Sequence, residues 1–371
     1  MTREELNKYL YTLINYEGSD LHIKAGEGIR FRIHGELHKV ESPKLTRESV
    51  VNLLKELLRS RFEEMVKNKE IDFSYKLDEN YRFRANAFFQ VDGPSIVFRV
   101  IPLKIPTLDE LDFPNVIRKF TEIERGLVLV TGVTGSGKST TLAALINEIN
   151  EKKAKHIITI EDPVEFIHKD KKSLINQRSL GEDTRSFTTA LRAALREDPD
   201  IILVGEMRDR ETIEIALHAA ETGHLVFSTL HTLDAKETIN RIIGVFPIDE
   251  QQRIRLVLSS VLQGIISQRL VPTVNKKRTA AMEVLISTPR IQDMILKNRD
   301  KEIKDALEEG KLIYGTQSFD QHLVDLVLSG KINEDTALTF ATSKDDLKLK
   351  LKQEKMKVGK DTKTTAIPLK D

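Results

Sequence analysis

At 371 residues, the chain is long enough for two or three folding units. Its 58 basic and 57 acidic side chains nearly cancel, so charge gives no reason to expect nucleic acid as a partner, and the lack of cysteine excludes disulfides and thiol chemistry. No apolar run approaches the roughly 20 residues of a membrane-spanning helix, and the N-terminus has no signal-peptide core. We therefore expect a soluble, cytoplasmic protein.

The first hundred residues have the pattern of a small α+β domain. Leucines recur at helical spacing in the opening segment and again in residues 47–58, while the stretches between and after them alternate as strands do. Residues 71–102 contain two turn signals and predict three consecutive strands. We predict a domain over residues 1–101 and a proline-rich linker over residues 102–114.

After the linker, apolar strands alternate with helical segments. The runs GLVLVTG, HIITIED, DIILVGE and HLVFSTLH are apolar on both faces, which is typical of a parallel sheet covered by helices on either side. We predict an α/β core over residues 115–289 and a helical region over residues 290–350, in which Ser318 caps a helix. The polar, lysine-rich residues 351–371 are expected to be disordered.

A phosphate-binding pattern, G-x-x-x-x-G-K-[ST], occurs as GVTGSGKS between an apolar strand and a helical stretch. Its glycines let the backbone curl so that N–H groups and the helix N-terminus face the phosphates. Lys138 would reach the β- and γ-phosphates, and the Ser139 hydroxyl would bind Mg²⁺. A glycine-rich turn without a ligand is the weaker alternative, because motif and context agree. The predicted nucleotide-binding residues are Gly132, Val133, Thr134, Gly135, Ser136, Gly137, Lys138, Ser139 and Thr140.

Acidic residues follow two of the predicted strands. Glu161 and Asp162 end one strand, and Glu206 follows another, where many phosphate-loop proteins carry Asp. The carboxyl ends of parallel strands face the ligand crevice, so these side chains can converge on the phosphates. One would activate the attacking water and another would hold Mg²⁺; Glu206 is a candidate for both roles, and the sequence leaves the division open. For either residue, the alternative is capping of the next helix. Without a guanine-recognition N-K-x-D motif, ATP is favoured over GTP.

These segments resemble the four boxes of the secretion-type ATPases of type IV pili and type II secretion. The boxes are the Walker A loop, an Asp box (IITIEDPVEF), a Walker B variant with Glu (ILVGEMRD) and a His box (TGHLVFSTLHT), in the family's order. The resemblance covers nearly the whole chain. It implies an α/β protein with a PAS-like α+β N-terminal domain, a RecA-like P-loop ATPase core and C-terminal helices.

The same resemblance implies partners and a location. The expected assembly is a homohexamer that hydrolyses ATP with Mg²⁺ at clefts between the two domains. It would attach peripherally to the cytoplasmic face of the inner membrane, through a PilC-like platform protein, and nucleic acid is not expected to bind.

Within this family, the chain is most similar to the pilus-retraction branch, which powers twitching motility. It starts directly at the PAS-like unit, lacks the four-cysteine insertion of export ATPases and carries the C-terminal GTQSFDQHLVDLVLSGKI. Residues 290–297, RIQDMILK, keep only the apolar spacing of that branch's A-I-R-N-L-I-R-E signature. A PilU-like accessory retraction ATPase and another secretion or pilus-assembly ATPase are the nearest alternatives. A non-hydrolysing scaffold and a nucleic-acid motor are more distant ones.

The resemblance also indicates which side chains sense the γ-phosphate. Arg84 and Arg99 lie on strands that would face the nucleotide cleft, and Arg82 shares a strand face with Arg84; the alternative is a row of solvated edge-strand charges. His231, at the C-terminal end of its strand, is expected near the phosphates, whereas His224 begins that strand. The two histidines are an odd number of residues apart, so an ideal strand cannot direct both to one phosphate.

Overall fold

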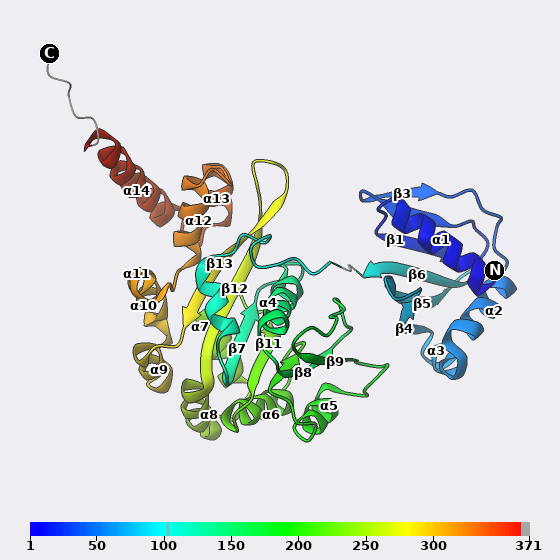
Figure 1. The fold of residues 1–371 in the computed structure, drawn as a ribbon, viewed down its shortest axis with the longest axis horizontal. Coiled ribbons are helices and arrows are strands. Elements are labelled where there is room, and N and C mark those ends of the chain that lie inside the picture. Colours follow the sequence, from blue (N-terminus) through cyan, green and yellow to red (C-terminus); the bar gives the residue numbers. More distant parts are fainter. Residues whose placement is uncertain (102–103, 365–371) are drawn as a thin grey trace, which may run out of the picture. The chain divides into compact units, whose positions relative to one another are not determined.

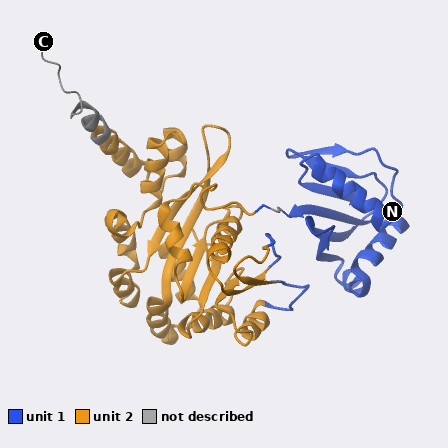
Figure 2. Cartoon of the chain, in the orientation of Figure 1, with its two compact units in different colours: residues 1–104, 162–167, 178–186 blue, residues 105–161, 168–177, 187–371 orange. Residues whose placement is uncertain are grey.

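The computed structural model describes residues 1–101 and 104–364, with side chains up to residue 356. The chain divides into two compact units (Figure 2). The first contains residues 1–104, 162–167 and 178–186, and the second contains residues 105–161, 168–177 and 187–371. Residues 102 and 103 of the predicted linker lie outside the described residues.

The first unit is built on a six-stranded antiparallel sheet with the order β3-β2-β1-β6-β5-β4. Leucines of the opening helix are fully buried together with Phe83 and Phe98 of the sheet, which forms the core of this unit. The predicted helices and strands are present. They are α1 (Arg3–Asn15), β1 (Asp20–Lys24), β2 (Arg30–Ile33), β3 (Glu36–Lys39), α2 (Arg47–Leu58), η1 (Arg59–Arg61), α3 (Phe62–Asn68), β4 (Glu70–Lys76), β5 (Arg82–Gln90) and β6 (Gly93–Ile101).

The second unit contains a seven-stranded sheet with the order β13-β12-β7-β11-β10-β8-β9. The strands from β12 to β8 in this order are parallel, whereas the edge strand β13 runs antiparallel to β12. The four apolar runs of the sequence form β7, β8, β10 and β11. The strands are β7 (Gly126–Thr131), β8 (His156–Glu161), β9 (Leu174–Ser179), β10 (Ile201–Val204), β11 (Leu225–Leu230), β12 (Leu262–Pro272) and β13 (Arg278–Ile286).

Helices cover both faces of this sheet (Figure 1). Val128 and Val130 of β7 pack toward the face that carries η2 and α4, and Leu127 and Leu129 pack toward the face that carries α5 to α8. Burial on both sides explains why the strand sequences are apolar throughout. These helices are η2 (Asn115–Thr121), α4 (Lys138–Lys152), α5 (Phe187–Ala194), α6 (Arg210–Glu221), α7 (Ala235–Gly244) and α8 (Ile248–Val261).

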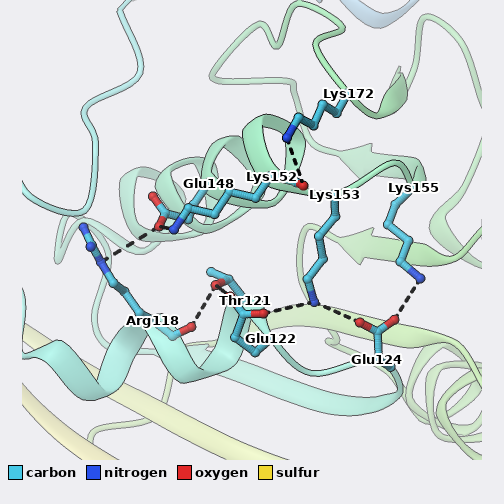
Figure 3. Close-up of polar contacts among 9 residues, drawn as sticks. All are labelled: Arg118, Thr121, Glu122, Glu124, Glu148, Lys152, Lys153, Lys155 and Lys172. Atoms are coloured by element: carbon cyan, nitrogen blue, oxygen red, sulfur yellow. Dashed lines mark hydrogen bonds and ion pairs between the residues drawn. The ribbon is translucent and has the colours of Figure 1, made fainter.

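The far end of α4 is fixed by ion pairs (Figure 3). Glu124, just before β7, contacts Lys153 Nζ at 2.9 Å and Lys155 Nζ at 2.8 Å, and these ammonium groups, Lys155 first, hold its pKa below the ordinary value. Glu148 within α4 pairs with Lys152 at 2.5 Å and lies 3.9 Å from Arg118 of η2. The helix is therefore tied to the sheet at the end opposite the phosphate-binding pattern.

The helices from residue 319 onward pack on the β12–β13 hairpin through a separate apolar cluster that includes Val271, Ala281 and Phe319. Ile291 and Leu307 of the preceding helices belong to the core that also contains α7 and α8. As predicted, Ser318 caps α12: its hydroxyl accepts a hydrogen bond from the Gln321 N–H. The helices are α9 (Pro289–Leu296), η3 (Asp300–Glu302), α10 (Ile303–Glu309), α11 (Lys311–Tyr314), α12 (Phe319–Leu328), α13 (Glu334–Phe340) and α14 (Lys344–Thr364).

The expected disorder over residues 351–371 is wrong for residues 351–364, which belong to α14. Leu347 and Leu351, one turn apart, are buried in the C-terminal cluster and dock the helix. Lysine, glutamate and glutamine, which made this segment appear disordered, are also good helix formers, so docking one turn is enough to continue the helix. Residues 365–371 lie outside the described residues.

Candidate active site

Four parallel strands bring their C-terminal ends to one edge of the second unit's sheet. In the order β7, β11, β10 and β8, neighbouring strands are paired in register. The phosphate loop follows β7, and His231 follows β11. Glu206 lies just beyond β10, and Glu161 is the last residue of β8. The topology thus places the loop, the imidazole and two carboxylates along the same edge.

The phosphate loop adopts the left-handed backbone conformations that its glycines allow. Gly132 has φ 143° and Gly137 has φ 90°, and α4 begins directly afterwards at Lys138. Lys138 is buried, and its Nζ donates hydrogen bonds to the carbonyl oxygens of Gly132 at 2.8 Å and Val133 at 3.1 Å. The ammonium group therefore bridges the start of the loop, next to its exposed tip.

The other loop residues differ in exposure. Val133, Thr134 and Gly135 are exposed, whereas Ser139 and Thr140 are half-buried at the start of α4. Ser136 is only 2% exposed, and within the described part of the chain its Oγ has no hydrogen-bond partner. A buried hydroxyl without a partner suits a phosphate oxygen, because buried polar groups otherwise find partners within the protein.

Glu206 is a buried carboxylate held between two neighbouring strands. The N–H of Gly205 donates to Ile160 O at 2.7 Å on one side, and the N–H of Met207 donates to Thr229 O at 3.2 Å on the other. The Glu206 side chain forms an ion pair with Arg208, and its Oε2 lies 3.3 Å from His231 Nε2. Glu206 of the Walker B variant and His231 of the His box are therefore in direct contact.

Glu161 accepts hydrogen bonds from a side chain of its own strand and from one of β9. Its Oε1 accepts a hydrogen bond from Thr159 Oγ1 at 2.6 Å and a longer one from Gln177 Nε2 at 3.4 Å. Gln177 is held in turn, because its Oε1 accepts the N–H of His168 at 2.8 Å. Asp162, the next residue, is exposed.

The two histidines of the fourth box are separated as the sequence predicts. His231 contacts Glu206 at the C-terminal end of β11, whereas His224 precedes the first residue of that strand. A ring nitrogen of His224, Nδ1, lies 3.0 Å from Ala219 O at the end of α6. Of the two, only His231 stands at the edge that carries the phosphate loop.

The three candidate arginines lie in the first unit. Arg84 of β5 and Arg99 of β6 are direct cross-strand partners, and Arg82 is two residues from Arg84. Arg99 Nε donates to the buried Asp20 Oδ1 at 2.7 Å, although 68% of the Arg99 side chain is exposed. Arg84 is 3.9 Å from Asp72, and 47% of its side chain is exposed. Their proposed contact with the γ-phosphate stays a prediction.

Three further polar residues at this site were not predicted from the sequence. Arg208 pairs with Glu206, Thr159 orients Glu161, and Gln268 of β12 contacts the phosphate loop. The strand GIISQRLV does carry a signal for the last of these, because a buried Ser-Gln pair interrupts an otherwise apolar strand. Buried amides need partners, so the pair indicates a polar neighbour.

The residues present suit Mg²⁺ bound together with a nucleotide. The described residues contain no cluster of three or more His, Cys, Asp or Glu side chains that could hold a metal ion by themselves. Mg²⁺ prefers a few carboxylate or hydroxyl ligands together with phosphate oxygens and water. Ser139 at the start of α4 and Glu206 on the same sheet edge would supply that donor set.

The family model of the type II/IV secretion system proteins matches residues 2–355. The chain belongs to this secretion ATPase family. The twitching motility protein of Neisseria gonorrhoeae is 48% identical over 85% of both chains. The type IV pilus retraction ATPase PilT of Pseudomonas aeruginosa is 47% identical over 86% of this chain and 93% of its own. The predicted family is confirmed.

A solved structure agrees with this membership of the secretion ATPases. The pilus retraction motor PilT with bound ADP superposes with a TM-score of 0.86 at 42% identity, covering 94% of this chain and 99% of that one. The predicted α/β fold class, with an N-terminal domain and an ATPase core, is confirmed. Among the described residues, no helix combines the length and apolar character needed to cross a membrane.

Proposed function

We propose that this secretion ATPase is a Mg²⁺-dependent homohexameric motor that hydrolyses ATP to retract a type IV pilus and power twitching motility. One observation supports it above all: the phosphate loop, Glu161, Glu206 and His231 share one sheet edge in a chain that is 47% identical to a retraction ATPase. The motor would act in the cytoplasm, attached peripherally to the inner membrane through a PilC-like platform protein.

The contacts suggest different roles for the two carboxylates. Glu161, oriented at one oxygen by Thr159 and Gln177, would hold the attacking water and accept its proton, since a base must be fixed in direction. Glu206, with Ser139, would hold Mg²⁺, which neutralises charge on the β- and γ-phosphates. Lys138 would release the loop carbonyls to reach the same phosphates.

His231 lies between Glu206, the proposed Mg²⁺ ligand, and the segment that follows β11. Its Nε2 contact with Glu206 and its place at the end of β11 let it respond when the γ-phosphate leaves. The arginines of β5 and β6 would supply the cation that phosphoryl transfer commonly requires from outside the loop. The roles of Arg82, Asp162 and His224 are auxiliary in this proposal.

Deletion of the gene in its native host tests the function. We expect cells that keep surface pili in excess and do not twitch, because extension continues without retraction. Complementation with the intact gene should restore motility, and a Glu206→Gln gene should not. Cells without pili would instead indicate an extension or export motor, and normal motility would exclude a necessary role in retraction.

A further inference from the structure

Strand β12 continues past the end of β7 and runs beside the phosphate loop. Ser267 pairs with Thr131, the last residue of β7, so Gln268 lies level with Gly132, the first residue of the loop. Gln268 is 2% exposed. A β-carbon at Gly132 would collide with the carbonyl oxygen of Gln268, so the strand and the loop are in direct backbone contact.

The Gln268 side chain joins the loop to the first turn of α4. Its Nε2 donates a hydrogen bond to Ser136 O at 2.6 Å, and its Oε1 accepts one from Thr141 Oγ1 at 2.8 Å. Ser136 and Thr141 are both buried, at 2% and 0% exposure. One amide thus satisfies two groups that water cannot reach, one in the loop and one in the helix.

The bond to Ser136 sets the direction of a loop N–H group. In a planar trans peptide, the carbonyl of one residue and the N–H of the next point in opposite directions. Because Ser136 O points to Gln268, the N–H of Gly137 points away from β12. Gly137 precedes Lys138 in the motif, where loop N–H groups bind phosphate.

We propose that Gln268 is a positioning residue that holds the phosphate loop in its nucleotide-binding conformation. This inference rests on the proposed ATPase function. Gln268 does not touch the phosphates; it orients the peptide between Ser136 and Gly137 and fixes that peptide against Thr141. Donors arranged before the ligand arrives bind it more tightly, because they lose no freedom on binding.

Two substitutions test the two hydrogen bonds that the Gln268 amide forms with Ser136 and Thr141. Gln268→Met keeps the length of the side chain and removes both hydrogen bonds. Thr141→Val removes the contact with Gln268 Oε1 and the longer, 3.3 Å bond from the same hydroxyl to Gly137 O, and it keeps the bond between Gln268 and Ser136. Thr141→Ser keeps the hydroxyl and is the conservative rescue. The matched control is Gln263→Met, on the same strand but at the opposite end of β7, where the side chain lies against Gly126. Each variant of the full chain is measured for ADP affinity by titration, for KM and kcat with ATP, and for its thermal unfolding midpoint.

Gln268→Met should weaken ADP binding by about tenfold or more and raise KM, with a smaller loss of affinity in Thr141→Val. Thr141→Ser and Gln263→Met should bind ADP like the wild type. A Gln268→Met protein that melts earlier but binds ADP normally would show that the amide only stabilises the fold and would overturn the proposal. If Gln268→Met does not fold, normal ADP affinity in Thr141→Val would overturn it. A wild-type chain that binds no ADP would defeat the proposed function itself, which is a separate outcome.

Discussion

At the scale of single residues, the two active-site carboxylates differ in their neighbours. Glu161 accepts a hydrogen bond from the hydroxyl of Thr159, and Glu206 contacts Arg208 and His231. If these contacts reflect their roles, Glu161→Gln should reduce kcat by about a hundredfold or more and leave the Mg²⁺ concentration for half-maximal activity unchanged. Glu206→Gln should still bind ATP, hydrolyse it poorly and need more Mg²⁺.

Measuring the ATPase rate of each variant at increasing Mg²⁺ concentrations distinguishes the proposed roles of Glu161 and Glu206. Glu211→Gln is the matched control, because Glu211 is an exposed carboxylate on α6 that pairs with Arg192 at 2.7 Å. An identical Mg²⁺ requirement in both active-site variants would contradict the division of roles. Unchanged hydrolysis in either variant would remove that residue from the catalytic set.

Arg99 gives a second prediction at this scale. Its Nε donates to Asp20, but the side chain is 68% exposed, so the outer guanidinium nitrogens are accessible to a ligand. Arg99→Ala should bind ATP nearly as well as the wild type and hydrolyse it more slowly, because an added arginine stabilises mainly the transition state. Arg30→Ala, on strand β2 of the same sheet, is the control. A normal rate in Arg99→Ala would exclude the proposed role.

At the scale of elements, Glu283 of β13 caps the helix that follows the His box. Its Oε1 accepts the N–H of Ala235, the first residue of α7, at 2.8 Å. Burial raises the pKa of Glu283 from 4.5 to about 7, an effect that Asp234 reinforces and that the Ala235 hydrogen bond, Arg269 and Lys304 oppose. Between pH 4.5 and about 7, Glu283 is therefore protonated in the folded chain and ionised in the unfolded chain.

The sign of the pH effect follows from that proton. Stability falls as pH rises from 4.5 to about 7, and the loss reaches roughly 3 kcal/mol once Glu283 is ionised. Glu283→Gln keeps an oxygen for Ala235 and cannot ionise, so its stability relative to the wild type should increase across this window. Thermal midpoints of both proteins at several pH values measure this difference. Parallel pH curves for the two proteins would contradict it.

Sequence periodicity predicted the strands of the second unit because each is buried on both faces and therefore apolar throughout. Glu283 and Gln268 could not be assigned roles in that way, since the groups they contact lie 48 and 132 residues away in the chain. The phosphate loop was predictable because its function requires a local pattern. The helix over residues 351–364 was missed because the docking of Leu351 decides between disorder and helix in a segment whose polar composition is compatible with both.

At the scale of the whole molecule, the β12–β13 hairpin connects the phosphate loop to the C-terminal helices within the second unit. Gln268 faces the loop, while its cross-strand partner Met282 donates its N–H to His322 Nδ1 of α12 at 2.9 Å. Burial lowers the pKa of His322 to about 4, so this imidazole is neutral and accepts the bond at physiological pH. The hairpin thus lies between the phosphate loop and α12, with Gln268 and Met282 paired across its two strands.

The proposed homohexamer makes a prediction about mixed assemblies. If subunits of a ring hydrolyse ATP in concert, an inactive Glu206→Gln subunit should impair its active neighbours. The ATPase rate of mixtures assembled from unfolded or dissociated chains should then fall more steeply than the fraction of wild-type subunits. Glu211→Gln subunits, added in the same proportions, control for the exchange itself. A rate strictly proportional to the wild-type fraction would mean that each subunit works independently, and the motor would then need another source of coordination.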